Sequence, residues 1–330
     1  MNIRELDKEK LQYAVGGLLY MPAIRKDIAE IIVTKKYEDL MSVAICLEDS
    51  ISDDAVADAE KQLICTFHDL NKEIRENSFF NREDKPLIFI RCRNYKHMMH
   101  IWKLIKEYEN LFEGFLLPKF DTTNMCEYKE AIIKINQEAS SIKYILPILE
   151  SKQLIDIRTR VTCLGQIKEE LRDIKDYVLN IRVGGNDFCN QYGLRRTVNQ
   201  TIYDITVVSA ALCDIVNVFG RSYVISGPVW EYFDNGKDNL WKIGLERELA
   251  QDKVNGFIGK TCVHPSQLTS IRNSLRVDKS DLLDAQGIID KSYGKLGVAK
   301  SSNGQRMNEI KTHINWAKKV VALAEIYGTI

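Results

Sequence analysis

Eight short apolar runs, each bounded by glycine, proline or charged residues, constrain this 330-residue chain more than any other feature. Each run is apolar almost throughout, which is typical of strands that are buried on both faces of a parallel sheet. The runs cover Gly17–Met21, Ser42–Glu48, Pro86–Arg93, Gly114–Lys119, Lys143–Glu150, Val178–Gly185, Ser222–Gly227 and Gly256–His264.

Longer amphipathic segments separate these runs and predict helices. Eight strand–helix alternations predict an α/β chain folded as a (β/α)8 TIM barrel. The alternative, a doubly wound open sheet, normally carries a G-x-G-x-x-G loop after its first strand, and Tyr20–Ala23 has no such pattern. The clearest helical segments are Asp53–Leu70, Met98–Leu111, Met125–Ile135, Ile202–Phe219 and Leu240–Val254.

The chain is expected to divide into a TIM-barrel domain over residues 1–273 and a C-terminal helical extension over residues 274–330. Ser274–Gln305 is polar and contains scattered glycine and serine, which predicts a helix with loops. Met307–Tyr327 has the apolar spacing of a closing amphipathic helix. We interpret the extension as a lid or an intersubunit element, with simple packing against the barrel as the alternative.

Charge and hydropathy exclude several kinds of partner. The 46 Lys and Arg residues balance 46 Asp and Glu residues, so there is no basic excess for binding nucleic acid or an anionic membrane surface. No apolar run approaches the roughly 18 residues that a membrane-spanning helix needs. The eight cysteines are dispersed, without a C-x-x-C pair. We therefore expect a cytoplasmic protein with reduced thiols that acts on a small-molecule substrate.

Two carboxylates follow the fifth and sixth runs, at the strand ends where barrels carry their functional groups. Alternation places Glu150 on the face of Ile148, and Asp187 on the face of Ile181 and Val183. Adjacent strands lie about 4.8 Å apart, so the two carboxylates could share one ion. A site with only a few protein oxygen ligands is suitable for Mg²⁺, because this ion keeps water or substrate oxygens as its other ligands. The spacing is equally compatible with carboxylates that cap the helices that follow.

Two arginines end the third run. Arg91 and Arg93 share a face by alternation, and a guanidinium binds carboxylate or phosphate through a bidentate fork. The alternative is ion pairing with Glu48 or Asp49 at the end of the second run. Both interpretations are compatible, because such a pair would also preorganise the site.

Three further strand ends carry candidate groups. Lys119 ends the fourth run, and His264 ends the eighth as a ligand contact or a hydrogen-bonding group beside a helix start. The pair Gly184-Gly185 would let a ligand approach the backbone closely, since it has no side chains.

Six motifs in order resemble the HpcH/HpaI aldolase and citrate lyase beta-subunit superfamily, which includes malyl-CoA lyases. They are Leu47–Ile51, Arg91–Asn94, Leu117–Lys119, Leu146–Glu150, Gly184–Asp187 and Gly259–Pro265. The chain is most similar to the TIM-barrel carbon–carbon bond lyases that are often encoded near tellurium-resistance genes. That similarity lies in Gly193–Thr197, Pro228–Phe233 and Met307–Glu309, with His313 and Trp316.

The resemblance implies metal-assisted cleavage or formation of a carbon–carbon bond beside a carbonyl. It implies that Glu150 and Asp187 bind Mg²⁺ while Arg91 holds the oxygens of a keto acid and stabilises an enolate. The general base is open, because a metal-bound water, Glu48 or Asp49 could serve. The resemblance also implies a homo-oligomer, either a trimer or a hexamer.

Departures from the better-known relatives bear on the substrate. Cys46 replaces the first carboxylate of their Asp-Leu-Glu-Asp motif, and Pro228–Phe233 has no counterpart in the CoA lyases. A compact keto acid is therefore the expected substrate. The alternatives are an acyl-CoA thioesterase or lyase of the malyl-CoA type, and a non-catalytic binding or scaffold barrel.

Four residues around the sixth and seventh strand ends are candidates for substrate binding. Trp230 and Tyr232 could stack on a planar group, and Arg195 and Arg196 could bind phosphate or carboxylate. Each could instead pack the loop after the seventh strand. We expect Arg196 and Tyr232 to line the pocket mouth and CoA thioesters to be poor substrates.

Overall fold

Each of the eight apolar runs contains one strand of a single parallel sheet in the computed structural model, which describes residues 3–76, 85–290 and 296–330. The strands lie in the order β7-β6-β5-β4-β3-β2-β1-β8. Their bounds are β1 (Gly17–Pro22), β2 (Ser42–Cys46), β3 (Leu87–Arg91), β4 (Gly114–Leu117), β5 (Tyr144–Leu149), β6 (Ile181–Val183), β7 (Ile225–Ser226) and β8 (Lys260–Cys262).

The two end strands of this order meet, so the sheet forms a nearly closed barrel. Gly227, directly after β7, pairs in parallel with Lys260 of β8. The amide of Gly227 donates to the carbonyl of Gly259 at 3.0 Å. One step earlier, the amide of Ile258 donates to the carbonyl of Ile225 at 2.8 Å. The predicted TIM barrel is confirmed, because an open sheet would leave these two edges unpaired.

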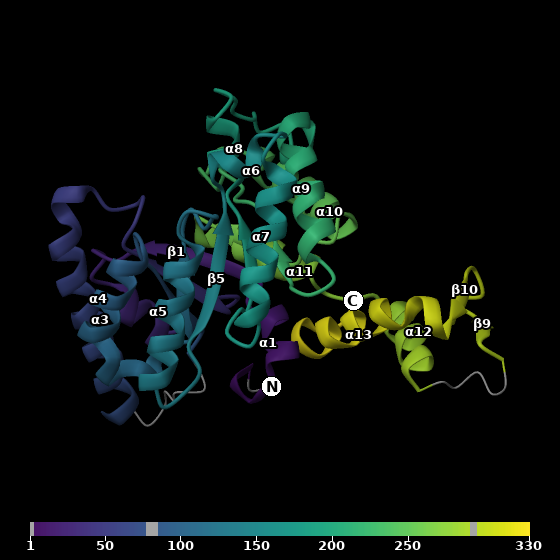
Figure 1. Cartoon of the computed structure of the whole chain (residues 1–330). Helices are drawn as coiled ribbons and strands as arrows, with labels where there is room; N and C mark the ends of the chain where they lie inside the picture. Colours follow the sequence, from purple (N-terminus) through teal and green to yellow (C-terminus); the bar gives the residue numbers. More distant parts are fainter. Residues whose placement is uncertain (1–2, 77–84, 291–295) are drawn as a thin grey trace.

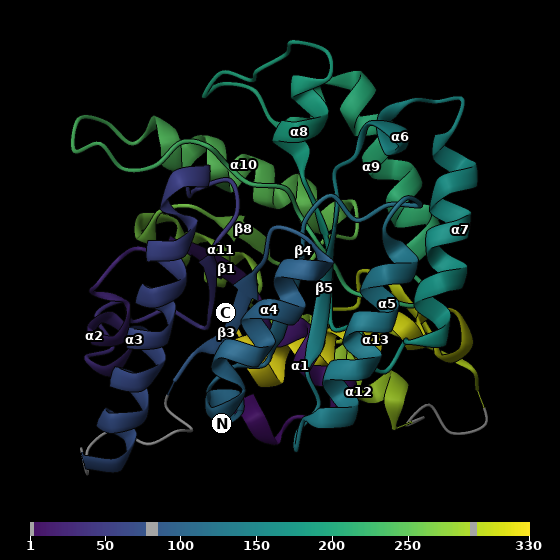
Figure 2. The ribbon, with the colours of Figure 1, turned by 60° about the vertical axis from the view of Figure 1, so that its left-hand side comes forward.

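Helices follow the strands and cover the outside of the barrel (Figure 2). All five predicted segments contain helix, and Leu240–Val254 keeps its predicted bounds. Asn94 illustrates a helix start: its side-chain oxygen accepts a 2.9 Å hydrogen bond from the amide of His97, which satisfies an otherwise unpaired donor. The helices of this layer are α2 (Ile28–Val33), α3 (Val56–Glu76), α4 (Tyr95–Ile105), α5 (Met125–Glu138), α6 (Lys152–Ile155), α7 (Arg160–Asp173), α8 (Gly185–Asn190), α9 (Thr206–Phe219), α10 (Leu240–Val254) and α11 (Leu268–Ser274), with 3-10 turns at Asp53–Ala55, Lys106–Leu111, Ile202–Asp204 and Pro265–Gln267.

Alternation along the strands divides the apolar side chains into two cores. Phe89 and Leu146 belong to a core that includes Leu18, in the barrel interior. Ile90 and Ile145, their chain neighbours, belong to the larger core between the strands and the outer helices. The interior of such a barrel is packed rather than open, so binding sites form at its ends.

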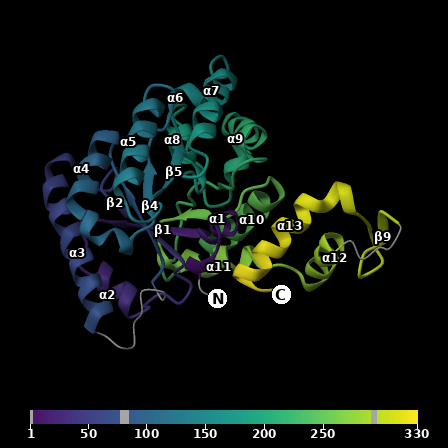
Figure 3. The same ribbon diagram turned by 60° about the horizontal axis from the view of Figure 1, so that its bottom comes forward.

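The C-terminal extension packs beside the N-terminal helix α1 (Lys8–Ala14), at the end of the barrel where β1 begins. The hydroxyl of Tyr327 donates to the carbonyl of Tyr13 at 2.7 Å, and Glu325 pairs with Lys10 at 2.6 Å. Figures 1 and 3 show the rest of the extension standing away from the barrel. Its elements are α12 (Lys279–Ile289), β9 (Val298–Lys300), β10 (Met307–Glu309) and α13 (Ile310–Tyr327).

One predicted boundary in the extension is wrong. The closing helix was expected from Met307, but Met307–Glu309 forms β10, which pairs antiparallel with β9, and the helix begins at Ile310. The apolar stripe explains this start, because its first member is Ile310. The division into residues 1–273 and 274–330 stays a prediction.

Two further expectations concern cysteine and hydropathy. All eight cysteines are free thiols, as expected. Among the described residues, no helix combines the length and the apolar character needed to cross a bilayer.

Candidate active site

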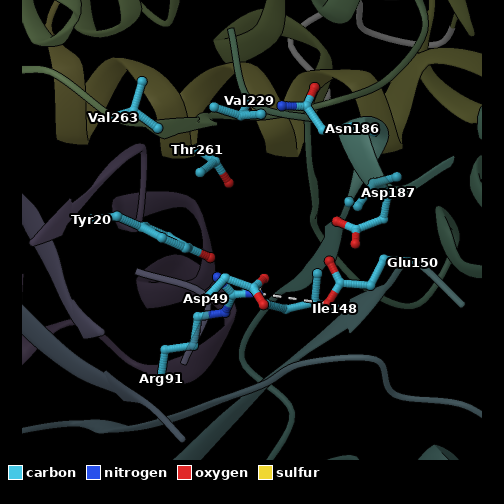
Figure 4. Close-up of a pocket in the computed structure, with 13 residues that line it drawn as sticks. Tyr20, Asp49, Arg91, Ile148, Glu150, Asn186, Asp187, Val229, Thr261 and Val263 are labelled. Carbon is cyan, nitrogen blue, oxygen red and sulfur yellow. Dashed lines mark hydrogen bonds and ion pairs between the residues drawn. The ribbon is translucent and has the colours of Figure 1, made fainter. Parts of the chain in front are cut away.

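The carboxyl ends of the strands surround a pocket of about 240 Å³ (Figure 4). Pockets for drug-sized ligands span roughly 300–1,000 Å³, so this pocket suits a compact molecule. It is lined by Tyr20, Asp49, Arg91, Ile148, Glu150, Val183, Gly184, Gly185, Asn186, Asp187, Val229, Thr261 and Val263. The predicted metal ligands and the predicted keto-acid arginine therefore share one pocket.

Glu150 directly follows β5 and faces this pocket together with Ile148, as alternation predicted. Its side chain is only 3% exposed. Its Oε1 accepts a 2.9 Å hydrogen bond from the backbone amide of Lys119. Lys119 has a left-handed backbone with φ of 50°, which is uncommon for a residue with a Cβ. The end of β4 therefore fixes the carboxylate that follows β5.

Asp187 lies in the first turn of α8, with its carboxylate beside that of Glu150 (Figure 4). Neither carboxylate caps a helix. The N-cap residues of α6 and α8 are Ser151 and Gly184, and neither helix start has a side-chain capping bond. Capping by a side-chain hydrogen bond is therefore absent at both helix starts, whereas Asp187 does lie in the first turn of α8, where the helix dipole favours a negative charge.

Burial and mutual repulsion shift the titration of these two carboxylates. Burial raises the pKa of Glu150, the charge of Asp187 raises it further, and the Arg91 guanidinium opposes the shift. Burial also raises the pKa of Asp187, and the nearby charge of Asp49 adds to the effect. Two crowded carboxylates of this kind would be relieved by a divalent cation between them.

The donor set fits Mg²⁺. Glu150 and Asp187 offer hard carboxylate oxygens in a pocket with room for water or substrate oxygens, which this ion keeps in its shell. Within the described ranges, no group of three or more His, Cys, Asp or Glu side chains could hold a metal by itself. Two protein ligands plus water and substrate is therefore the arrangement that the residues support.

The glycine pair makes room for neighbouring protein atoms. A Cβ on Gly184 would collide with Oε2 of Glu150, and a Cβ on Gly185 would lie 2.7 Å from Cβ of Pro228. Real Cβ atoms do not approach other heavy atoms this closely. The missing side chains therefore make room for Glu150 and Pro228. Both glycines also line the pocket, and the expected close approach of a ligand to their backbone stays a prediction.

Arg91 ends β3 and joins the carboxylates at the pocket wall. Its Nη2 lies 2.7 Å from Glu48, 3.0 Å from Asp49 and 3.8 Å from Glu150. Burial alone would lower the pKa of Arg91, but the nearby phenol of Tyr20 and the carboxylates raise it, so the guanidinium stays charged. Its buried Nε has no hydrogen-bond partner in the described part of the chain. The Arg91 side chain also lines the pocket.

The two candidate bases differ in accessibility. Glu48 is buried, and its two oxygens are held by Lys119 at 2.7 Å and by Arg91 at 2.7 Å. Asp49 is half-exposed and lines the pocket. Burial tends to raise the pKa of Asp49, but the hydrogen bond with Glu48 and the charges of Arg91 and Lys119 lower it overall. Asp49 is thus the accessible carboxylate, and it is ionised at neutral pH.

Arg93 and His264 are not part of the pocket lining. The strand β3 ends two residues before Arg93, so its alternation does not extend that far, and the Arg93 guanidinium pairs with Asp53. The Nδ1 of His264 accepts from the amide of Ser266 at a helix start, and its ring stacks on Phe233 with centroids 4.7 Å apart. For His264 the helix-start alternative describes the observed contacts.

The pocket lining also omits the four candidates near the sixth and seventh strands. Trp230 is fully buried beneath the guanidinium of Arg196, and the hydroxyl of Tyr232 donates to the carbonyl of Arg196 at 2.9 Å. Arg195 is 79% exposed and pairs with Glu231. This corrects the expectation that Arg196 and Tyr232 line the pocket mouth, because their polar groups hold the loop together.

The burial of Arg196 has an electrostatic cause. Its Nη1 lies 3.3 Å from Glu248, and the other oxygen of Glu248 lies 2.9 Å from Lys260. Lys260 also pairs with Asp252 at 2.6 Å. Two cations and two carboxylates neutralise one another between the barrel and α10. The positive charge of Arg196 is therefore neutralised by partners inside the protein.

Three residues of the site escape prediction from the sequence pattern. Tyr20 and Thr261 both line the pocket. They lie inside their strands, whereas candidate residues were expected at the strand ends. Arg182 points into the barrel, where it bonds Thr261. The expected shared face of Asp187 with Ile181 and Val183 is therefore wrong, because Ile181 and Val183 belong to the outer core whereas Asp187 lines the pocket. Strand β6 ends at Val183 and the chain turns into α8, so alternation does not continue to Asp187.

A sequence profile of the family described as C-C bond lyase of the TIM-barrel fold matches residues 9–329. The chain belongs to this family. The match spans the barrel and the extension, and it confirms the resemblance carried by the strand-end motifs. None of the curated proteins matches the chain.

Solved structures of citrate lyase beta subunits are similar to this lyase-family chain. Mycobacterium tuberculosis CitE in complex with magnesium, acetoacetate and coenzyme A has a TM-score of 0.61 at 17% identity, covering 96% of this chain and 100% of that chain. The M. tuberculosis citrate lyase beta subunit with oxaloacetate and magnesium has a TM-score of 0.52 at 17% identity, covering 83% and 99%. RipC from Yersinia pestis has a TM-score of 0.53 at 16% identity, covering 80% and 95%. At these identities the likeness establishes the shared fold.

Proposed function

We propose that this chain is a Mg²⁺-dependent carbon–carbon bond lyase, or a synthase in the reverse direction, acting on a compact keto acid through an enolate. The observation that carries the proposal is the meeting of Glu150 and Asp187 in one pocket with Arg91 beside them. Membership in a family of carbon–carbon bond lyases agrees with it, as does the magnesium named in several similar structures.

Each charged side chain of the pocket has a part in this reaction. Glu150 and Asp187 would hold the ion, which when bound supplies positive charge to the oxygens of the keto acid and its enolate. Arg91, which lines the pocket, would donate to the substrate carboxylate. Asp49 would accept the hydroxyl proton of the substrate during cleavage. Lys119, 3.4 Å from Asp49, would keep this carboxylate oriented.

Pocket size favours a compact substrate over a CoA thioester. The volume of about 240 Å³ is filled by a small keto acid, whereas a pantetheine arm would have to leave it. The alternative, an acyl-CoA thioesterase or a lyase of the malyl-CoA type, is supported by the coenzyme A in the M. tuberculosis CitE complex. A non-catalytic barrel would bind keto acids without turning them over.

The extension supports a further part of the proposal, a homo-oligomer of three or six copies. Its α12, β9 and β10 stand away from their own barrel (Figures 1 and 3), where they could contact a second copy. Light scattering on the full chain measures this mass directly, and a monomer at micromolar concentration would contradict it.

The activity is tested with the full chain, stripped of metal and then supplied with Mg²⁺. Release of pyruvate from 4-hydroxy-2-oxo acids and cleavage of malyl-, citramalyl- and citryl-CoA are followed in parallel. We expect Mg²⁺-dependent turnover of the keto acids, and slow cleavage of the thioesters. Fast thioester cleavage that saturates at micromolar concentration would overturn the compact substrate.

Variants test the metal site in the same assay. Glu150→Gln and Asp187→Asn should abolish Mg²⁺ binding in calorimetry and reduce turnover by about a hundredfold or more, because the ion supplies several kcal/mol of charge stabilisation. Glu231→Gln, a similar change at a carboxylate outside the pocket lining, is the matched control. Tight Mg²⁺ binding by the double variant would refute the assignment.

A further inference from the structure

Arg182 is a buried cation that pairs with no carboxylate of the described residues. It is 1% exposed, and its hydrogen-bond acceptors are neutral: Oδ1 of Asn180 at 3.3 Å and Oγ1 of Thr261 at 2.8 Å. In the described part of the chain, its Nε has no hydrogen-bond partner. Burying a charge in neutral surroundings costs free energy, which indicates that this guanidinium has a role toward the groups around it.

Two of those neighbours are hydroxyl groups that face the pocket. Tyr20 and Thr261 line it on the side opposite Glu150 and Asp187, and their hydroxyls point into the space between (Figure 4). Burial lowers the pKa of Arg182, and the nearby phenol of Tyr20 opposes this shift. The guanidinium therefore lies behind both hydroxyl groups.

The contact with Arg182 decides the direction of these hydroxyls. A guanidinium only donates, so Oγ1 of Thr261 accepts from it and the hydrogen of the Thr261 hydroxyl points elsewhere. The Tyr20 phenol lies near the same guanidinium, toward which its oxygen can only act as an acceptor. Within the described ranges, neither hydroxyl donates to a protein acceptor, so both hydrogens are available to a ligand. Burial raises the pKa of Tyr20, which keeps its proton in place. The positive charge behind the two oxygens strengthens them as donors.

We propose that the hydroxyls of Tyr20 and Thr261, held by the positioning residue Arg182, form an oxyanion site for the substrate oxygen beyond the scissile carbon–carbon bond. This inference rests on the proposed function. A keto acid anchored at the metal-binding carboxylates and Arg91 would extend its next carbon toward the opposite wall, where the two hydroxyls lie.

The charge on this substrate oxygen changes during the reaction. In cleavage, the substrate hydroxyl gives its proton to the base, its oxygen forms the new carbonyl, and the electron pair of the broken carbon–carbon bond passes to the enolate. The enolate then takes up a proton and becomes the keto acid. In synthesis the same oxygen gains negative charge as the bond forms. Two fixed donors stabilise that charge without reorganising.

The test compares two keto acids that differ at this oxygen. Oxaloacetate carries oxygens on the carbon next to the methylene group, whereas pyruvate ends before that carbon. Both are titrated into the full chain with saturating Mg²⁺ in a calorimeter. For Tyr20→Phe and for Thr261→Val, we expect oxaloacetate affinity to fall about tenfold or more, the effect of one hydrogen bond to a charged group. Pyruvate affinity should stay within about twofold.

Two further variants complete the design. Tyr144→Phe removes a tyrosine hydroxyl outside the pocket lining, at the other end of β5, and should leave both affinities unchanged. Arg182→Met should lower oxaloacetate affinity selectively and Arg182→Lys should restore part of it, a pattern that a structural role would not produce.

The outcomes separate this inference from the function on which it rests. Selective loss of oxaloacetate affinity in the hydroxyl variants supports the oxyanion site. Equal loss for both keto acids, or no loss, overturns it and leaves the proposed function standing. If the unaltered protein binds neither keto acid with Mg²⁺, the proposed function fails and the oxyanion site fails with it.

Discussion

The backbone amide of Lys119 donates a 2.9 Å hydrogen bond to Oε1 of Glu150, from a backbone with φ of 50°. This left-handed conformation costs roughly 1–2 kcal/mol for a residue with a Cβ, so strain is located at the strand end beside the pocket. The ammonium group of the same residue lies 2.7 Å from Glu48. One strained residue thus positions carboxylates that follow β2 and β5.

Replacing Lys119 tests this strain. We expect Lys119→Gly to be more stable than Lys119→Ala by about 1 kcal/mol, because glycine adopts this backbone without a Cβ clash. The measurement is the free energy of unfolding in urea. Lys35, with φ of 49°, is the matched control: its glycine and alanine variants should differ similarly but leave keto-acid binding unchanged. Equal stability of the two Lys119 variants would contradict strain.

The fork of Arg91 should matter more than its charge. Arg91→Lys keeps a cation but loses the planar pair of donors, so keto-acid affinity should fall by about tenfold or more. Calorimetry with pyruvate and saturating Mg²⁺ measures the loss. Arg93→Lys is the matched control, because its guanidinium pairs with Asp53, and it should stay within about twofold. Similar losses in both variants would remove Arg91 from its assigned role.

Metal affinity should depend on pH through the carboxylate pair. Burial raises the pKa of Glu150 to about 8, so below that pH the carboxylate pair holds a proton that Mg²⁺ must displace. We expect Mg²⁺ affinity to rise between about pH 5 and pH 8, with proton release on binding. Titrations in buffers of different ionisation enthalpy measure that release. Affinity that is flat over this range would argue against the raised pKa.

The stability of the metal-free protein should change in the opposite direction. A carboxyl group with a raised folded pKa favours the folded state most below its unfolded pKa, and this contribution is lost as pH rises through the folded pKa. The melting temperature without metal should therefore fall from pH 5 toward pH 8, and saturating Mg²⁺ should offset the fall. The Glu150→Gln variant, which cannot ionise there, should show a smaller slope.

The buried ion network around Glu248 should carry stability rather than activity. Glu248→Ala leaves Arg196 and Lys260 buried with one carboxylate fewer, which costs about 3–5 kcal/mol in comparable buried networks. Glu231→Ala, which breaks the pair with the exposed Arg195, should cost less than about 1 kcal/mol. Urea unfolding measures both. Comparable losses would mean that the buried network contributes no more than a surface pair.

The barrel and the position of Glu150 follow from local patterns in the chain. Runs such as Lys143–Glu150 are apolar on both faces, and a segment of that kind must be covered on both sides in a parallel sheet. Glu150 could be placed from the sequence because strand alternation relates it to Ile148 two residues earlier. Arg91 could be placed because it is the last residue of a strand that is apolar before it.

Only the tertiary structure decided which arginines reach the site. Arg196 follows a strand end in sequence, yet Glu248, 52 positions away, draws it into a buried ion network. Arg182 lies inside an apolar run, yet the early end of β6 at Val183 leaves it facing the barrel interior. Periodicity relates residues within one element, whereas the partners of these arginines come from segments far along the chain. Ion pairs between residues so far apart in the sequence depend on how the helices and strands pack. The local sequence pattern does not encode that packing.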